Sequence, residues 1–561
     1  MKRQVVLITG HTCNGKSYLA RALRDEFGFH LVRTSEILTR VSKARALPTD
    51  RLSLQILGDL LDQETSDRWV YDEVCLECDG MDSSQPVAVD NIRTAAQLDV
   101  FRSDPTLQVI HVHLYARPEE LEERFKKKLP EPGETATTYP DADLIKEEGD
   151  VQKFKADADV RIFTSRTDGR DTLVRVAARL GLYSPPNERC VDVVVGGQYG
   201  SEGKGHVAGY LSSEYDVLLR VGGPNAGHTV SSDSGVFTYH QLPSGARDTE
   251  AKLLLGPGMT IYVPDLLKEI EECGISEERL FIDPQAMIIT EEDKENEKRL
   301  VEEIASTGKG GGAAAARRIL ERNASTKLAR DIPELSSYVG LKAPYRGATR
   351  SNLEDAYSKR MSILLEGTQG TGLSIFHGAY PYVTSRDTTV AGCLAEAGIS
   401  PSRVRRILMV IRPTPIRVGD PDKGGTSGPL KHPVEFREIA NEAGLDPDDV
   451  TRLERTSTTD RPRRVGWFEW DSFRDACSLN APTDIVLTFA DYLSATNRNA
   501  RRFEQLDSDT IKFVEELERV AQAPVSLINT RFPREGERID IRSIIDRRSW
   551  VTGKRRQRAT G

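Results

Sequence analysis

The sequence lacks any run of apolar residues close to the length of about 20 that a membrane-spanning helix needs. Its first residues, MKRQVVLITG, enter a strand-like pattern instead of a secretory signal. Cysteine is also scarce: seven residues, an odd number, are scattered over 561 positions, which disfavours a disulfide framework. The one C-x-x-C pair, Cys75 and Cys78, has no second pair with which to complete a zinc site. We therefore expect a protein of the reducing cytoplasm without membrane partners.

An excess of positive charge is missing as well. The formal net charge is −9, which argues against a protein that coats nucleic acid. Apolar and aromatic residues make up 38% of the chain and charged residues 29%, as in globular proteins. Because the chain is longer than one domain of about 100–200 residues, it predicts several structural units.

A phosphate-binding loop is present near the N-terminus, in VVLITGHTCNGKSYLARAL. An apolar run of buried-strand type leads into Gly10, Gly15, Lys16 and Ser17, which fit the pattern G-x-x-x-x-G-K-S, and a helical pattern follows. The glycines allow backbone N–H groups to surround phosphates, Lys16 neutralises their charge, and the Ser17 hydroxyl can ligate Mg²⁺. We interpret this segment as the phosphate site of a P-loop domain.

Residues suited to a second substrate follow this loop. The apolar strand in PVAVDNIR ends at Asp90, an acid of the type that holds the metal or its water shell, and Arg33 and Arg93 are candidate phosphate-binding cations. Together with VHLYARPEELEERF, which looks like a strand leading into an arginine-bearing lid helix, these blocks make residues 1–182 resemble nucleoside monophosphate kinases of the adenylate kinase and dephospho-coenzyme A kinase kind. The resemblance implies phosphorylation of a (deoxy)nucleoside monophosphate, and leaves open whether that acceptor is dGMP, a modified deoxynucleotide or an unrelated nucleotide.

The order of strand, loop and helix occurs twice, which predicts two α/β units. The segment YSPPNER at 183–189 is rich in proline and polar residues, as linkers are, and CVDVVVGG restarts a buried-strand pattern after it. We predict a P-loop kinase-like domain of parallel strands flanked by helices at 1–182 and a larger α/β domain at 190–545. Residues 546–561 are predicted to form a basic tail.

A second glycine-rich loop, GGQYGSEGKG at 196–205, follows that strand. Gln198 takes the place of the first glycine of the P-loop pattern, and Gly205 replaces the hydroxyl residue after the lysine, so this loop is of another kind. Its glycines still permit close approach of an anion to the backbone, and Lys204 supplies positive charge. The loop therefore predicts a second phosphate site.

Further blocks follow this loop in order: GGPNAGHTV, ASTGKGGG, LLEGTQGTGLSIFHGAYPYVTSRDTT, TSTTDRPRRVGW and IVLTFADYL. Their succession closely resembles adenylosuccinate synthetase over most of residues 190–535. The resemblance implies an enzyme that phosphorylates the 6-oxygen of a purine monophosphate with a nucleoside triphosphate and then displaces that phosphate with the amine of L-aspartate. It also implies Mg²⁺ and a homodimer that shares an arginine across its interface, for which Arg317, Arg318 and Arg322 are the candidates.

The resemblance assigns roles to residues of these blocks. His228 matches the general acid, Lys204 the contact to the donor phosphates, and Ser201 and the Gly227 carbonyl the positions of magnesium ligands. The predicted catalytic residues are Ser201, His228, Lys204 and Gln369. The predicted nucleotide contacts are Ser201, Glu202, Gly203, Lys204, Asn225, Ala226, Gly227, His228, Thr307, Gln369, Thr384 and Arg461. The predicted aspartate contacts are Ser457, Thr458, Thr459, Asp460, Arg461 and Arg463, of which the two arginines have guanidinium groups that can grip both carboxylates.

One departure from the family bears on the purine substrate. Ordinary members have an aspartate at the position of Ser201, which accepts the purine N1 proton and ligates magnesium, whereas a serine hydroxyl stays neutral and is a poor base. Serine is also shorter and can accept a hydrogen bond from a 2-amino group, so it suits guanine. The pattern is similar to the viral branch of the family, which converts dGMP, L-aspartate and ATP to 6-succino-2-amino-2'-deoxyadenylate for 2-aminoadenine DNA.

The block expected to contact the donor base departs too. Common members use a lysine and an aspartate to read the guanine of GTP, whereas here Phe489 replaces the lysine and Asp491 remains. This makes ATP or dATP the expected donor, with GTP as the alternative. Asp491, Asn529 and Thr530 are the predicted contacts of the donor base.

Two other interpretations stay open. One is a conventional adenylosuccinate synthetase that uses IMP, with its base function moved to another residue. The other is a nucleotide-binding regulator that has lost catalysis together with the aspartate. Decaying loops should lose glycines and cations first, and the presence of Lys204, His228 and Gln369 weighs against this second alternative.

Overall fold

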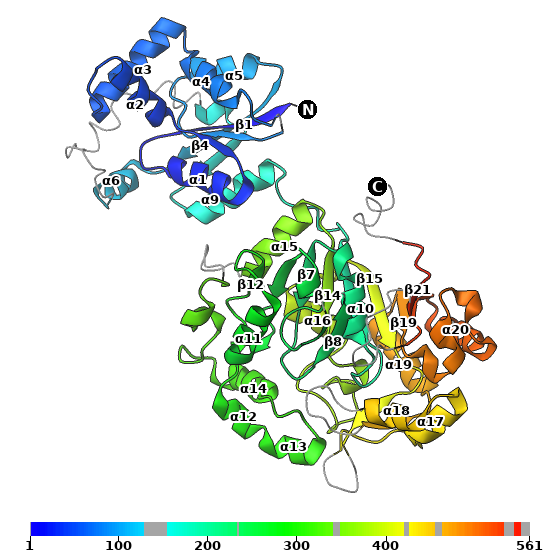
Figure 1. Cartoon of the computed structure of the whole chain (residues 1–561). Coiled ribbons are helices and arrows are strands. Elements are labelled where there is room, and N and C mark those ends of the chain that lie inside the picture. Colours follow the sequence, from blue (N-terminus) through cyan, green and yellow to red (C-terminus); the bar gives the residue numbers. More distant parts are fainter. Residues whose placement is uncertain are drawn as a thin grey trace. The chain divides into compact units, whose positions relative to one another are not determined.

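The computed structural model describes residues 2–82, 84–127, 154–232, 235–339, 348–419, 426–454, 463–531 and 543–550. The chain divides into two compact units, Met1–Tyr183 and Ser184–Gly561 (Figure 1). The segment predicted as a linker begins at this division. From Ser184 on it is held by the second unit, where the Arg403 guanidinium donates to the Ser184 hydroxyl at 3.2 Å and to the Pro185 carbonyl at 2.5 Å.

The first unit is a parallel sheet of five described strands in the order β2-β3-β1-β4-β5. Along β1, Val5 and Leu7 enter one apolar cluster and Val6 and Ile8 the other, so helices cover both faces of the sheet. The strands are β1 (Arg3–Gly10), β2 (His30–Val32), β3 (Val87–Val89), β4 (Leu107–Tyr115) and β5 (Val160–Phe163). The helices are α1 (Lys16–Phe27), α2 (Thr34–Ala44), α3 (Arg51–Thr65), α4 (Trp69–Cys78), α5 (Ala95–Ser103), α6 (Pro118–Lys127) and α9 (Gly169–Arg179).

The second unit is built on a nine-stranded sheet in the order β12-β10-β7-β14-β6-β15-β19-β20-β21. All neighbours pair in parallel except the edge pair β20 and β21. The strands are β6 (Val191–Gly196), β7 (Val217–Arg220), β10 (Lys252–Leu255), β12 (Leu280–Ile282), β14 (Ile363–Glu366), β15 (Val404–Ile411), β19 (Asp484–Leu487), β20 (Val525–Asn529) and β21 (Ile544–Asp546). Smaller sheets are formed by β8 (His228–Ser232) with β9 (Gly235–Tyr239), by β11 (Thr260–Ile261) with β13 (Met287–Ile288), and by β16 (Ile416–Val418), β18 (Arg463–Gly466) and β17 (Pro433–Val434).

The central strands of this sheet are buried on both faces, as the near-continuous apolar runs predict. Val193 of β6 packs into the cluster that contains α15, α16, α19 and α20, whereas its neighbour Val194 packs into the cluster that contains α10 and α11. The helices are α10 (Lys204–Leu211), α11 (Val263–Cys273), α12 (Glu291–Asn296), α13 (Lys298–Ile304), α14 (Gly311–Glu321), α15 (Ala348–Ser358), α16 (Val390–Ala397), α17 (Phe436–Ala443), α18 (Pro447–Leu453), α19 (Trp470–Asn480) and α20 (Ser508–Ala521). Of the described helices, none combines the length and apolar character needed to cross a membrane.

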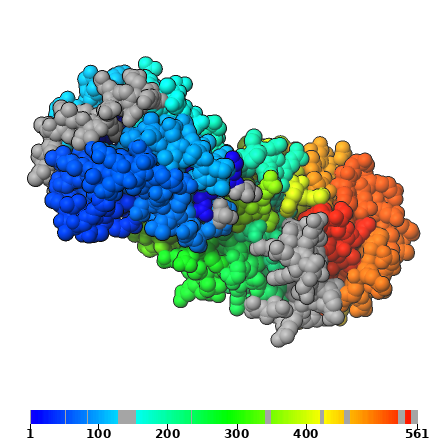
Figure 2. Space-filling model, turned by 90° about the horizontal axis from the view of Figure 1, so that it is seen from above, coloured from blue at the N-terminus to red at the C-terminus, as the bar shows by residue number. Residues whose placement is uncertain are grey.

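Residues 546–550, which the sequence assigned to a basic tail, are instead packed on the second unit. The Arg548 guanidinium is fully buried and pairs with Glu214 at 2.8 Å, and the Trp550 indole donates to Asp484 at 2.9 Å. Residues around β21, drawn red, lie flush with the orange surface that includes α20, where Arg547 pairs with Glu518 (Figure 2). The unit therefore extends to Trp550, and the rest of the predicted tail lies outside the described residues.

Candidate active site

A cavity of about 470 Å³ lies where loops leave the carboxyl ends of β6, β7, β14, β15 and β19. Because these strands are parallel, their carboxyl ends share one edge of the sheet, which is where such folds bind ligands. The predicted site residues that line this cavity are Ser201, Gly203, Lys204, Asn225, Ala226, Gly227, His228, Thr307, Gln369, Thr384, Arg463 and Asp491. The structure thus brings together residues from all the blocks of the sequence except the segment Ser457–Arg461, which lies outside the described residues.

The glycine-rich loop forms one wall of the cavity. Gly203 has φ of 85°, a left-handed conformation that favours glycine, and it caps the start of α10. Gly196 has no room for a side chain, because a Cβ there would lie 2.7 Å from the Gln369 carbonyl oxygen. Lys204 Nζ donates to Glu202 Oε2 at 2.7 Å, and both side chains are buried. Glu202 therefore lies behind the cavity as the counter-ion of the lysine and is not part of the lining.

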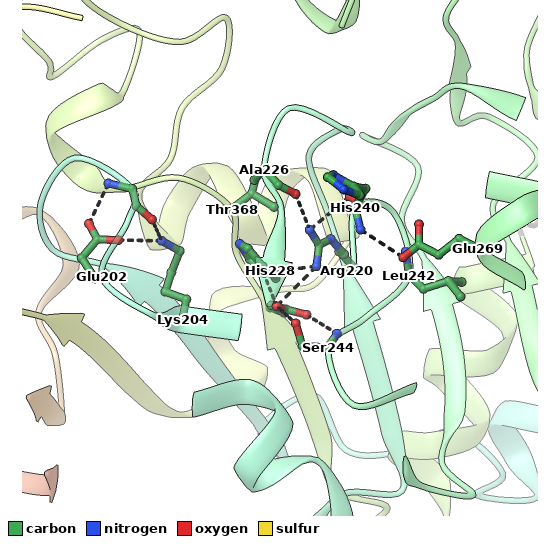
Figure 3. A network of polar contacts seen from close by, with 12 residues as sticks. Glu202, Lys204, Arg220, Ala226, His228, His240, Leu242, Ser244, Glu269 and Thr368 are labelled. Atoms are coloured by element: carbon green, nitrogen blue, oxygen red, sulfur yellow. Dashed lines mark hydrogen bonds and ion pairs between the residues drawn. The ribbon is translucent and has the colours of Figure 1, made fainter. Parts of the chain in front are cut away.

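His228 begins β8 and lies against the start of α10, since a Cβ on Gly205 would be 2.5 Å from His228 Cβ. Its Nδ1 contacts Glu366 Oε1, and Arg220 Nη1 lies 3.2 Å from the same nitrogen (Figure 3). Burial, followed by the charge of Arg220, lowers the pKa of His228 to about 4. The imidazole is therefore neutral in the protein without substrate.

Several predicted contacts have buried polar atoms without a hydrogen-bond partner among the described residues. They are Asn225 Oδ1, Thr307 Oγ1, Gln369 Oε1, Asp491 Oδ1 and both amide atoms of Asn529. Gln369 also has an uncommon left-handed backbone, with φ of 63°, while its Nε2 donates to the Thr384 hydroxyl at 2.8 Å. Buried polar groups in folded proteins are normally paired, so the four of these residues that line the cavity, Asn225, Thr307, Gln369 and Asp491, are suited to a polar ligand; Asn529 is not part of the lining. Thr530, by contrast, donates its hydroxyl to the Ser543 carbonyl at 2.9 Å.

A group of charged and aromatic residues forms the wall nearest to Asp491. The Arg412 guanidinium lies 4.2 Å from the centre of the Phe489 ring and donates to Glu454 at 2.7 Å. Arg463 pairs with the other oxygen of Glu454 at 2.8 Å, which is how the predicted aspartate contact is held here. Asp491 accepts from Arg498 at 3.0 Å, and burial raises the pKa of the Asp491 carboxyl. Glu454, Arg412 and Arg498 were not predicted from the sequence.

The predicted phosphate loop of the first unit lies at the carboxyl end of β1. Gly10 has φ of 140°, and a Cβ there would lie 2.2 Å from the Leu114 carbonyl oxygen; Gly15, with φ of 90°, caps α1. Lys16 Nζ donates to the carbonyls of Gly10 at 2.8 Å and His11 at 2.7 Å. Ser17 is exposed in the first turn of α1, so its hydroxyl is accessible.

The remaining predicted residues of this unit differ in their position relative to the loop, in their exposure and in their partners. Asp90 follows β3, the neighbour of β1, so it lies at the same edge as the loop, and burial raises the pKa of its carboxyl. Arg33 is partly exposed and pairs with Glu36 at 2.7 Å. Arg93 is mostly buried, and its guanidinium pairs with the Asp59 carboxylate at 2.6 Å, so its main contact is an ion pair within the unit.

The three arginine candidates for a shared contact between subunits lie on or just after α14, away from the cavity lining. Arg317 is bound to Asp293 at 2.8 Å, and Arg318 donates to the carbonyls of Pro257 at 3.1 Å and Gln285 at 2.8 Å. Arg322 is exposed and has no polar partner among the described residues. Of the three, Arg322 is the one whose guanidinium binds none of the residues that the structure describes.

Fold and cavity together define an α/β enzyme that binds nucleotides at the edge of a parallel sheet. The family model described as adenylosuccinate synthetase matches residues 193–330 and 313–499, and the chain belongs to this family. The adenylosuccinate synthetase of Methanocaldococcus jannaschii is 34% identical over 360 residues, which cover 63% of this chain and 96% of that protein. The corresponding protein of Pyrococcus horikoshii is 33% identical over 367 residues, covering 64% and 99%. The second unit is therefore a ligase that joins L-aspartate to a purine nucleotide.

Two solved structures share the fold of this unit. The succinoaminodeoxyadenylate synthetase of cyanophage S-2L, bound to dGMP and to dATP as an energy donor, is 28% identical with a TM-score of 0.51 and covers 66% of this chain and 98% of its own. The fully ligated adenylosuccinate synthetase of Plasmodium falciparum is 22% identical with a TM-score of 0.51 and covers 64% and 100%.

The buried Glu454 makes the stability of the second unit depend on pH. Burial tends to raise the pKa of this carboxyl, but the charges of Arg412 and Arg463 prevail and lower the pKa to about 2, from an ordinary value of 4.5. A carboxyl with a lowered pKa contributes stability above its unfolded pKa, and this contribution is lost as pH falls toward the folded value. Between pH 6 and pH 3 we expect the wild type to lose on the order of 2 kcal/mol of unfolding free energy that Glu454→Gln does not lose.

Urea unfolding across this pH range measures the difference. Glu442→Gln, a matched change on the exposed side of α17, is the control and should retain the acid sensitivity of the wild type. Equal acid sensitivity of Glu454→Gln and Glu442→Gln would contradict the assignment.

Proposed function

We propose that the second unit uses dGMP as its purine substrate and joins L-aspartate to the 6-position, giving 6-succino-2-amino-2'-deoxyadenylate. The observation that carries this proposal is Ser201, which lines the cavity where the family pattern has an aspartate. A short neutral hydroxyl leaves space for the 2-amino group of guanine and can accept its hydrogen bond. The cyanophage relative, whose structure contains dGMP, supports the same substrate.

In this proposal the cavity residues divide the work of the reaction. Lys204 neutralises charge on the donor phosphates, and His228 is the acid that stabilises the 6-oxygen and the transferring phosphoryl group. Gln369 and Thr384, linked at 2.8 Å, hold the purine monophosphate by neutral hydrogen bonds, together with the Thr307 hydroxyl, which has no partner in the described part of the chain. Arg463 turns from Glu454 to the carboxylates of L-aspartate, with help from the segment 457–461.

Magnesium fits this site as an ion shared with the substrates. The described residues contain no cluster of three or more His, Cys, Asp or Glu side chains that could bind a metal by themselves. Mg²⁺ commonly takes only one or two oxygens from the protein and the rest from phosphates and water. The Ser201 hydroxyl and the Gly227 carbonyl, both in the cavity lining, are the oxygens that would hold it. When bound, it would neutralise the charge of the donor phosphates.

The proposed phosphate donor is ATP or dATP. The Arg412 guanidinium covers one face of the Phe489 ring. A phenyl ring can stack on a base, but it has no hydrogen to donate to the 6-oxygen of guanine. Asp491 Oδ1 and the Asn529 amide, which are buried and have no partner among the residues that the structure describes, can accept from and donate to the amino-pyrimidine edge of adenine. Thr530 would contact the donor base through its backbone atoms, because its hydroxyl already donates to the Ser543 carbonyl.

Replacing Ser201 by aspartate tests the purine assignment. In Ser201→Asp we expect the ratio of kcat/KM for dGMP to that for IMP to fall at least about tenfold. The aspartate would crowd the 2-amino group of guanine or leave it without a partner, and a buried amine in that state costs about 1–3 kcal/mol. Absorbance changes with aspartate and ATP in excess measure both rates. Ser201→Ala is the control, since it keeps the space and should keep the preference for dGMP. Use of IMP alone by the wild type would instead establish a conventional synthetase, and nucleotide binding without any product would establish a regulator.

Replacing Phe489 by lysine tests the donor assignment. We expect the wild type to prefer ATP to GTP, and Phe489→Lys to raise the GTP to ATP ratio of kcat/KM at least about tenfold, because an ammonium can donate to the guanine 6-oxygen. Phe489→Tyr keeps the ring and should keep the preference for ATP. A wild type that uses GTP better than ATP would rule out this assignment.

We propose further that the first unit is a kinase for a nucleoside monophosphate and that the protein is a homodimer. The loop with Lys16 and Ser17, beside Asp90, has the parts that phosphoryl transfer needs, and the partly exposed Arg33 is suited to an acceptor phosphate. Ile319 and Leu320 are exposed in the last turn of α14 and offer an apolar surface. Arg322, the arginine expected to reach the second subunit, follows directly after this helix.

The kinase proposal predicts separable activities. Without L-aspartate, the full chain should form ADP from ATP in the presence of at least one of dGMP, GMP, dAMP or AMP. Lys16→Ala should lower this rate at least about 100-fold and leave the aspartate-dependent reaction unchanged. Chromatography of the nucleotides measures both. Nucleotide turnover that persists in Lys16→Ala, or no turnover with any acceptor, would contradict the proposal.

A further inference from the structure

Behind His228, three buried residues form a polar network that no sequence motif indicated (Figure 3). Arg220 ends β7 and Glu366 ends β14, and the parallel register of these strands places the two residues directly beside each other. Both side chains are buried, with exposed fractions of 0% and 2%, and Arg220 Nη1 lies 3.4 Å from Glu366 Oε1. A buried ion pair of this kind is retained in a fold only where its hydrogen bonds are well satisfied.

The partners of the Glu366 carboxylate are donors. Its Oε2 accepts from the Ser244 backbone N–H at 2.7 Å, and its Oε1 accepts from the Ser244 hydroxyl at 2.5 Å and faces Arg220. Burial tends to raise the pKa of this carboxyl, but Arg220 and His228 lower it to about 2. Glu366 is therefore a carboxylate that can only accept hydrogen bonds. His228 Nδ1 has two neighbours, the acceptor Glu366 Oε1 and, at 3.2 Å, the donor Arg220 Nη1. The carboxylate is the nearer of the two and can only accept, which favours a hydrogen on Nδ1, with Arg220 Nη1 directed to Glu366 Oε1.

Arg220 connects this carboxylate to the wall of the cavity. Its Nη2 donates to the Ala226 carbonyl at 3.2 Å and to the His240 carbonyl at 3.1 Å. The turn that contains Ala226 also contributes Asn225 and Gly227 to the cavity lining. One guanidinium thus fixes both the carboxylate behind His228 and the turn in front of it.

We propose that Glu366 is a positioning residue that fixes His228 as the Nδ1–H tautomer, with Arg220 and Ser244 holding Glu366 in place. Nε2 then faces the substrates and is unprotonated in the protein without substrate. It acts as an acid after it takes up a proton from solvent, and the imidazolium, whose Nδ1–H stays bonded to Glu366, donates to the 6-oxygen or the phosphoryl group. His228 Nε2 has no partner among the described residues, and the ring lines the cavity. The inference rests on the proposed function for the role of His228, and on the structure alone for its tautomer.

The tautomer can be measured without any substrate. In ¹⁵N-histidine NMR spectra of the full chain at neutral pH, one of the nine histidine signals is assigned to His228 by its loss in His228→Asn. We expect that signal to show a protonated Nδ1 and an unprotonated Nε2. A protonated Nε2 in the wild type would overturn the proposal, whatever purine the enzyme uses.

Glu366→Gln tests the consequence for the reaction. The amide has only one acceptor oxygen and cannot satisfy Ser244 N–H and His228 together, so the ring loses its fixed tautomer. We expect kcat to fall at least about 100-fold, the range that general acid catalysis supplies, with KM values for purine and aspartate within about threefold of the wild type. The rate is measured with whichever purine monophosphate the wild type converts, so a failure of the dGMP proposal does not affect this result.

Glu269→Gln is the matched control. Glu269 is a buried carboxylate close to this network that accepts from the backbone N–H groups of His240 at 3.0 Å and Leu242 at 3.2 Å, without contacting His228 (Figure 3). It should lose stability yet keep the His228 tautomer and most of kcat. If Glu366→Gln lowered kcat no more than Glu269→Gln, the role of Glu366 would be structural and the proposal would be wrong. If Glu366→Gln did not fold, the tautomer of the wild type would still decide the question.

Discussion

The parallel register of the large sheet is the constraint on which the site depends. Strands β7, β14, β6, β15 and β19 run side by side in one direction, so the loops that leave their carboxyl ends must meet at one edge. The glycine-rich loop follows β6, the turn with Gly227 follows β7, Gln369 follows β14, and Phe489 follows β19. The cavity is therefore a product of the strand order, and no single loop forms it.

Buried ion pairs reinforce this edge. Glu366 with Arg220 joins β14 to β7 behind the cavity, Glu454 with Arg412 joins the segment after α18 to the end of β15, and Glu202 with Lys204 fixes the glycine-rich loop on the start of α10. Removing such charges from water is costly unless each finds partners, and here hydrogen bonds satisfy the carboxylate oxygens. The result is a wall of fixed dipoles and charges that is formed before substrate binds, which is the arrangement that stabilises developing charge with little reorganisation.

The two glycine-rich loops and the helices that follow them could be predicted from the sequence, because their glycines, lysines and helical residues are neighbours along the chain. The blocks with His228 and Gln369 were found only through the resemblance to a family. Glu366 and Arg220 could not be assigned a role in advance, because it depends on the pairing of strands whose residues are 146 positions apart. The same holds for Arg93, whose bond to Asp59 appears only after packing. A charged residue at the end of a buried strand is the one signal in the sequence that could have singled out Glu366 and Arg220.

We propose that Ser201 adapts an adenylosuccinate synthetase site to guanine. A crystal structure of the full chain with dGMP, L-aspartate and a non-hydrolysable ATP analogue measures it most directly. We expect the Ser201 hydroxyl to lie within about 3 Å of the guanine 2-amino nitrogen, a normal hydrogen-bond distance. A structure in which that amine contacts another side chain, with Ser201 turned away from the base, would contradict it.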